Sequence, residues 1–208
     1  MRARWAIAYS NISVQIREVD LKNKPKELLE ISSKKTVPVL DLKDFVIEES
    51  IDIILWSLEE SFDKNKFLDF YKRNHYLIDS LINENDNLFK YHLDRFKYSN
   101  RYKDININYH KTEALKILNE LNKRIKLSSS NNKMGWLINN EESIADWAIW
   151  PFVRQFINSY PSIFEENAHL EELQKWVNYF INQDLFSYIM LKNKVWVKND
   201  LPTFFGKR

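Results

Sequence analysis

The sequence predicts a fold class of α/β plus all-α, with an α/β domain over residues 1–60 and an all-helical domain over residues 67–208. In the first part, short β-branched runs alternate with short helical patterns. In the second part, longer segments place apolar residues at helical spacing, and the polar stretch 59–66 between the two parts is typical of a linker. With 44% apolar and 14% aromatic residues, the chain can bury a core in each part.

Composition limits the possible partners. The 31 Lys and Arg residues are dispersed among 29 Asp and Glu residues, which gives no electrostatic case for nucleic acid. The sequence contains no cysteine, and so it offers no disulfide and no thiolate metal ligand. No apolar run approaches the roughly 18 residues of a membrane span, and the N-terminus lacks the apolar core of a signal peptide. We expect a cytoplasmic protein without nucleic-acid or membrane partners.

The α/β part is predicted to follow the order helix, strand, helix, hairpin, helix. A helical run, a β-branched run and a helix start with proline in its first turn come first, at Ala3–Tyr9, Val14–Val19 and Asn23–Pro25. The apolar runs Val37–Leu40 and Phe45–Ile47, joined by a polar turn, predict an antiparallel hairpin. From Ser50, apolar residues at i, i+3, i+4 and i+7 predict a helix of about three turns.

The second part is predicted to contain long helices. We expect helices over 67–97, 112–125, 143–157 and 170–191, with a bend near 83–87 and a break near 182–184. We expect a loop over 127–133 and a loose extension over 195–208. Ser143 followed by Asp146 suits an N-cap pair at the start of its helix.

Several residue types that often carry chemistry have a simpler explanation here. Three tryptophans fall at apolar positions of the predicted helices, so we expect them in the core: Trp147, Trp150 and Trp176. The four histidines show no metal-ligand spacing and are expected at the surface or in packing: His75, His92, His110 and His169. Because the histidines lack this spacing and the chain has no cysteine, we expect no metal. With only two glycines, the chain also has no glycine-rich phosphate loop.

The stretch around Pro38 is the most informative. Proline cannot donate to a strand ladder, and so its place in an apolar run indicates a special geometry, for which we expect a cis Val37–Pro38 bond. A cis bond would turn the backbone of Val37 outward at a sheet edge, where an extended peptide can pair.

Glu49 and Ser50 follow at the start of the next predicted helix. Free N–H groups and the Ser50 hydroxyl suit a carboxylate there, and Glu49 suits an ammonium group. Together with Val37, these groups fit a small peptide that ends in an α-amino acid. A helix cap and an ordinary turn proline explain the same residues equally well, and the residues alone leave both interpretations open.

The chain resembles a known family in several segments with correct order and spacing. Val19–Pro25, Thr36–Leu40 and Ile47–Ser50 resemble the glutathione-binding half of glutathione S-transferases, most closely omega-like and related bacterial members. Ser143–Ile149 and Asp184–Lys192 are similar to segments of the family's helical half. The resemblance implies a thioredoxin-like N-terminal domain, an all-helical C-terminal domain, a homodimer and glutathione as co-substrate.

The resemblance also implies roles for particular residues. Val37 would pair with the cysteinyl backbone of glutathione beside cis-Pro38. Glu49 and Ser50 would hold the γ-glutamyl end, and Lys24 would reach the glycine carboxylate. The family often has glycine where this chain has Lys35, which leaves the conformation of that turn open.

One expected part of the family pattern is not in this sequence. Members begin with a central strand and a Cys, Ser or Tyr nucleophile shortly before the first helix, whereas Met1 aligns inside that helix. The catalytic residue is therefore unknown, and we expect it upstream of Met1, with Met1 as an internal methionine.

Three functions follow as alternatives. The first is a glutathione transferase that uses the glutathione thiol for conjugation to an electrophile or for thiol–disulfide chemistry. The second is a non-catalytic interaction or regulatory module with the same fold. The third is an inactive truncated product.

Overall fold

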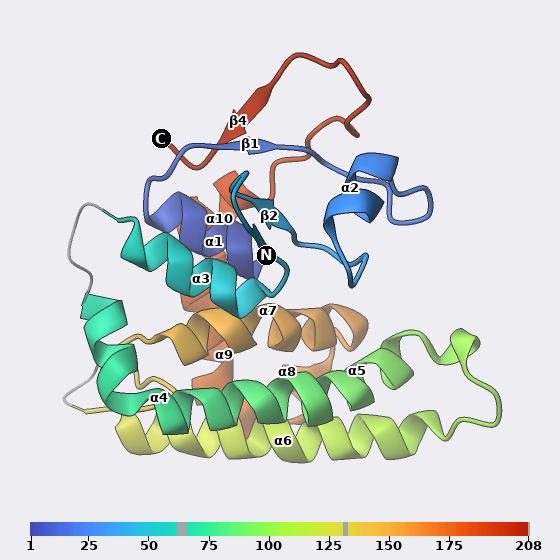
Figure 1. The fold of residues 1–208 in the computed structure, drawn as a ribbon. Coiled ribbons are helices and arrows are strands. Elements are labelled where there is room, and N and C mark those ends of the chain that lie inside the picture. Colours follow the sequence, from blue (N-terminus) through green and yellow to red (C-terminus); the bar gives the residue numbers. More distant parts are fainter. Residues whose placement is uncertain (62–65, 131–132, 208) are drawn as a thin grey trace. The chain divides into compact units, whose positions relative to one another are not determined.

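The computed structural model describes residues 1–61, 66–130 and 133–207. The chain divides into two compact units, Met1–Leu68 with Asp184–Arg208 (unit 1), and Asp69–Gln183 (unit 2) (Figure 1). From the sequence we expected Asp184–Arg208 in the helical domain, whereas in the structure this segment packs with the α/β elements of unit 1. Parts of the predicted linker and of the predicted loop, residues 62–65 and 131–132, lie outside the described residues.

Unit 1 is organised around helix α1 (Arg2–Tyr9), which contacts both α3 (Ser50–Glu59) and α10 (Asp184–Ile189). Trp5 and the three residues after it are all buried, so this short helix is apolar on more than one side. The apolar face of α3, with Ile53, Ile54 and Leu58, is buried in the same unit. Helix α2 (Lys26–Ile31) also belongs to this unit.

The strands of unit 1 form two antiparallel pairs. Strand β1 (Val14–Ile16) pairs with β4 (Thr203–Phe205), and β2 (Leu40–Asp41) pairs with β3 (Val46–Ile47). The predicted hairpin therefore forms, but its strands are shorter than the apolar runs.

The end of the chain corrects the expectation of a loose extension. Phe205 of β4 is buried, and its ring stacks on that of Tyr188 with 5.0 Å between centroids. Gly206 donates its backbone N–H to the Tyr188 hydroxyl (3.0 Å) and has a φ of 108°, a conformation that favours glycine. A Cβ at Gly206 would lie 1.8 Å from the Ile12 carbonyl oxygen. These contacts hold the last strand against α10 and β1.

Unit 2 is built of helices whose order matches the predicted segments. The long helix of the sequence is divided into α4 (Lys66–Glu84), a π-helical turn η1 (Asn85–Phe89) and α5 (Lys90–Lys97), and the irregular turn lies close to the predicted bend. The remaining elements are η2 (Ser99–Arg101), α6 (Ile107–Ser128), α7 (Ile144–Ser159), α8 (Ile163–Glu166), η3 (Ala168–Leu170) and α9 (Glu171–Ile181).

Large aromatic side chains fill the core of unit 2. Trp147, Trp150 and Trp176 are fully buried, as the apolar spacing predicts. The Trp150 and Phe180 rings stack almost in parallel, 5.1 Å between centroids and 3° between planes. Among the described residues, no helix combines the length and apolar character that a bilayer span requires.

Two histidines without a predicted partner meet inside unit 2. His92 on α5 and His110 on α6 are both buried, and their Nδ1 atoms lie 2.9 Å apart. At this distance one Nδ1 donates and the other accepts, so a single proton lies between two neutral rings. Burial lowers the pKa of both rings, and the nearby charge of Arg95 lowers it further. For His92, the positive form of His110 also lowers the pKa, whereas Glu113 raises it.

This pair predicts a pH dependence of stability. The folded pKa values lie below the unfolded value of about 6.5, so the folded pair is destabilised as the pH falls below that value and the unfolded chain takes up protons. Urea unfolding followed by circular dichroism at about pH 7.5 and about pH 5.5 measures this loss.

A substitution assigns the loss to the pair. His92→Gln removes one of the two titrating rings and should show a smaller fall in the unfolding free energy than the wild type. His169→Gln, at an exposed histidine, should match the wild type. An equal fall in His92→Gln would contradict a role for the pair.

Candidate functional site

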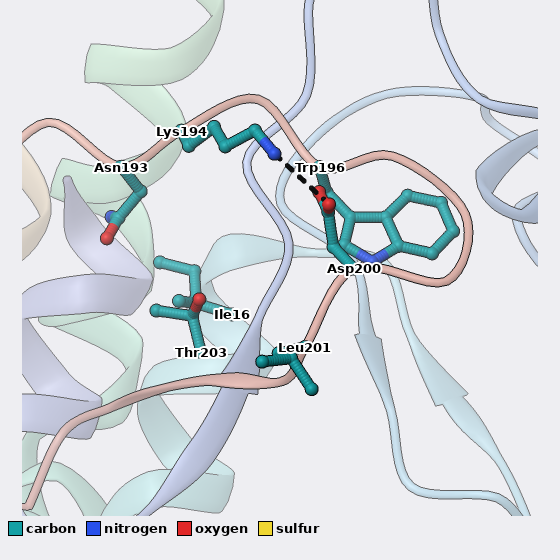
Figure 2. Close-up of a pocket in the computed structure, with 7 residues that line it drawn as sticks. All are labelled: Ile16, Asn193, Lys194, Trp196, Asp200, Leu201 and Thr203. Atoms are coloured by element: carbon teal, nitrogen blue, oxygen red, sulfur yellow. Dashed lines mark hydrogen bonds and ion pairs between the residues drawn. The ribbon is translucent and has the colours of Figure 1, made fainter.

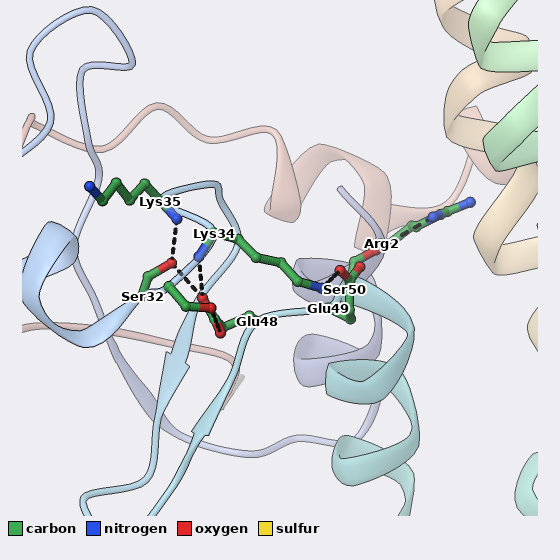
Figure 3. A network of polar contacts seen from close by, with 8 residues as sticks. Arg2, Ser32, Lys34, Lys35, Glu48, Glu49 and Ser50 are labelled. Atoms are coloured by element: carbon green, nitrogen blue, oxygen red, sulfur yellow. Dashed lines mark hydrogen bonds and ion pairs between the residues drawn. The ribbon is translucent and has the colours of Figure 1, made fainter.

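The candidate site lies in unit 1, at the loop Ser32–Lys35 and at the segment Glu48–Ser50 that leads from β3 into α3 (Figure 3). Val37 follows this loop in the chain. The Val37–Pro38 peptide bond is cis, and the Val37 residue is 43% exposed. Lys35 has a φ of 54°, in the left-handed region that favours glycine. The turn therefore adopts a glycine-type conformation with lysine in place.

Glu48 fixes the loop that precedes Pro38. Its carboxylate accepts hydrogen bonds from the Ser32 hydroxyl (2.7 Å), the Ser33 hydroxyl (2.9 Å) and the Lys34 backbone N–H (3.0 Å). The Lys34 N–H and the two hydroxyls hold the pKa of Glu48 down at about 2. The Ser32 hydroxyl also accepts the Lys35 backbone N–H (2.8 Å).

The sequence patterns assigned Glu48 no role, although it lies next to Glu49. The only available signal is the combination of an acid before Glu49 with the serine pair Ser32–Ser33. That signal is weak, because the hydrogen bonds join segments 14 to 16 positions apart.

Glu49 and Ser50 stand at the start of α3, as predicted. Glu49 is the N-cap residue and makes no side-chain cap hydrogen bond; its carboxylate instead forms an ion pair with the Lys34 ammonium group. The Ser50 hydroxyl accepts a long hydrogen bond from Arg2 Nη1 (3.5 Å). The positive end of α3, the Ser50 hydroxyl and the Arg2 guanidinium together favour an anion.

Lys24, which precedes α2 in the chain, contacts the same loop. Its Nζ donates to the Lys35 carbonyl oxygen at 2.8 Å. The structure therefore brings Lys24 and Glu49 to one loop, each through a neighbouring lysine, and that loop leads directly to Val37. Ser50 is adjacent to Glu49 in the chain and is contacted by Arg2.

The groups of this arrangement are chemically suited to a zwitterionic, extended molecule. A carboxylate suits an ammonium group, a helix start with a hydroxyl and a guanidinium suits a carboxylate, and exposed backbone suits a peptide. Within the described residues, no group of three or more His, Cys, Asp or Glu side chains could hold a metal ion.

A separate cavity of about 320 Å³ lies in unit 1 against the last part of the chain (Figure 2). None of the predicted site residues lines it. Lys194 and Asp200 face each other across part of its wall, with 3.1 Å between Nζ and Oδ1. The other lining residues are Ile16, Asn193, Trp196, Leu201 and Thr203.

The fold defines a class of protein, in which a thioredoxin-like domain is followed by a helical domain. Residues 1–66 match the family model of the glutathione S-transferase N-terminal domain. The first part of this chain is therefore similar to that domain, and the comparisons with solved structures give the whole chain the glutathione transferase fold.

Solved structures match nearly the whole chain at low sequence identity. A glutathione transferase from Pseudomonas putida, with one glutathione disulfide bound per subunit, is 16% identical with a TM-score of 0.71, covering 90% of this chain and 84% of that chain. A glutathione S-transferase from Rhodospirillum rubrum is 16% identical with a TM-score of 0.70, covering 97% and 90%. Glutathione transferase Omega 3C from Trametes versicolor is 14% identical with a TM-score of 0.70, covering 93% and 85%. No curated protein sequence gives a significant match.

Proposed function

We propose that this chain binds glutathione at the candidate site and uses the glutathione thiol for conjugation or for thiol–disulfide exchange. The observation that carries this proposal is the placement of Glu49 and Lys24 around one loop beside Val37, with the start of α3 adjacent. The glutathione disulfide in the Pseudomonas putida structure supports the choice of ligand.

The charges of glutathione complement these groups. Its γ-glutamyl end carries an ammonium group and a carboxylate, which Glu49 and the Ser50 end of α3 would hold. Its central peptide unit would pair with the backbone of Val37 next to Pro38. Its glycine carboxylate, at the opposite end, would bind the Lys24 ammonium group.

The reaction follows from the thiol. In conjugation, the glutathione sulfur forms a bond to an electrophilic carbon, and the leaving group departs with the electron pair of its bond. In exchange, the thiolate attacks one sulfur of a disulfide and releases the other as a thiolate. We assign no residue of this chain to activation of the thiol. A homodimer and a cytoplasmic location are part of the same proposal.

Isothermal titration calorimetry with reduced glutathione tests the proposal. We expect one site per chain, with binding at least about tenfold weaker for the dipeptide Cys-Gly, which lacks the γ-glutamyl end. No measurable binding, or equal binding of the two peptides, would overturn the proposed site. It would favour a non-catalytic interaction module of the same fold.

A further inference from the structure

The loop Ser32–Lys35 is held by polar contacts with three residues of unit 1, Glu48, Glu49 and Lys24. Glu48 accepts three hydrogen bonds from it, Glu49 pairs with the Lys34 side chain, and Lys24 donates to the Lys35 carbonyl oxygen. Figure 3 shows the Lys34 side chain stretched from the loop to Glu49 at the start of α3.

Two of these contacts use groups that the proposed glutathione site needs. The Glu49 carboxylate forms an ion pair with the Lys34 ammonium group, at the position that the ligand ammonium group would take. The Lys24 ammonium group donates to the Lys35 carbonyl oxygen, at the position that the ligand glycine carboxylate would take. The Glu48 contacts use none of the groups assigned to the ligand.

We propose that Lys34 is an internal competitor of glutathione, and that ligand binding exchanges the Lys34–Glu49 and Lys35–Lys24 contacts for contacts with the tripeptide. This inference rests on the proposed function and adds a residue that sets the affinity. It also predicts that the Ser32–Lys35 loop stays attached through Glu48 while its two other contacts change.

The burial of the groups fits an exchange of this kind. The Lys34 and Glu49 side chains are 52% and 56% exposed, so their pairing is a surface ion pair and can be displaced easily. At Glu49, one ammonium group replaces another, and the local charge is unchanged. At Lys24, a charged carboxylate replaces a neutral carbonyl, which strengthens the hydrogen bond. Glu48 stays ionised at neutral pH because its folded pKa is about 2.

The chain offers a matched pair of variants for the test. Lys34→Gln removes the competing ammonium group, whereas Lys35→Gln removes the same charge from the next position of the same loop. Both variants keep the backbone N–H and carbonyl groups that Glu48, Ser32 and Lys24 bind. Because glutathione is a net anion at neutral pH, Lys35→Gln also measures the long-range effect of losing one positive charge.

Titration calorimetry with reduced glutathione at about 0.1 M salt gives the result. We expect Lys34→Gln to bind about threefold more tightly than the wild type, and Lys35→Gln to bind equally or more weakly. Thermal melting of both variants should match the wild type, because both positions are exposed.

Each other outcome overturns the inference. If the wild type binds glutathione and Lys34→Gln binds no more tightly than Lys35→Gln, Lys34 does not compete, and the proposed function stands without it. If Lys34→Gln binds more weakly than Lys35→Gln, Lys34 contacts the ligand directly. If the wild type does not bind glutathione, the inference and the proposed function fail together.

Discussion

Glu49→Gln is expected to weaken glutathione binding roughly ten- to a hundredfold, the factor that corresponds to losing a hydrogen bond to a charged group. The substitution keeps the shape and one acceptor oxygen but removes the charge that would hold the ligand ammonium group. Glu49 is the N-cap of α3 without using its side chain as a cap, so α3 should keep its start. Titration calorimetry of the variant against the wild type measures the effect.

Glu59→Gln is the matched control for this prediction. Glu59 is the last residue of α3 and is exposed, so the variant removes the same charge from the far end of the same helix. We expect its affinity for glutathione to equal that of the wild type within about twofold. Equal affinities of Glu49→Gln and Glu59→Gln would remove Glu49 from the site.

Asp146→Ala is expected to lower the free energy of unfolding by about 3–5 kcal/mol. Asp146 is fully buried and accepts hydrogen bonds from four donors. These are the Ser143 N–H (2.9 Å) and hydroxyl (2.7 Å), the Leu137 N–H (3.1 Å) and the Trp176 Nε1 (2.9 Å). Alanine would leave these donors buried without the Asp146 acceptor and would remove the Asp146 half of the capping box of α7.

Urea unfolding followed by circular dichroism measures this loss. Asp184→Ala, at an exposed aspartate that starts α10, should cost no more than about 1 kcal/mol. If Asp146→Ala does not fold, Asp146→Asn keeps one acceptor oxygen and gives an intermediate value. A loss in Asp146→Ala no larger than in Asp184→Ala would contradict the account of this site.

Burial raises the pKa of Asp146 to about 6, and hydrogen bonds from Ser143, Leu137 and Trp176 counteract that rise.

Local sequence patterns predicted much of the fold. The N-cap pair of Ser143 and Asp146 is confirmed, because both partners lie within one turn of the same helix. The helix that begins at Ser50 was predicted from its apolar stripe and is observed over Ser50–Glu59. Both features depend on residues close together in the chain.

Long-range contacts explain what the sequence did not predict. Strand β4 forms because Phe205 stacks on Tyr188 and pairs with Val14. A local sequence pattern cannot predict a strand partner that is so distant in the sequence. His92 and His110 meet because α5 packs against α6. The contacts of Glu48 likewise join the residue after β3 to the loop after α2, 14 to 16 positions away in the chain.

The glutathione-binding roles of the candidate site residues stay a prediction. Lys24 and Glu49 do approach one loop, but each contacts a neighbouring lysine or its carbonyl group. Periodicity and turn signals place a side chain near a site, whereas the partner of an exposed lysine is decided by the tertiary structure. Only the ion pair with Glu49 in the structure therefore shows that Lys34 lies at this site.

A crystal structure of this chain with reduced glutathione tests the central claim most directly. The account predicts the γ-glutamyl group between Glu49 and Ser50, the cysteinyl backbone paired with Val37, and the glycine carboxylate at Lys24. Glutathione bound elsewhere, for example in the cavity lined by Ile16 and Trp196, would contradict it. A crystal grown with excess glutathione but without density for it at Glu49 would also contradict it.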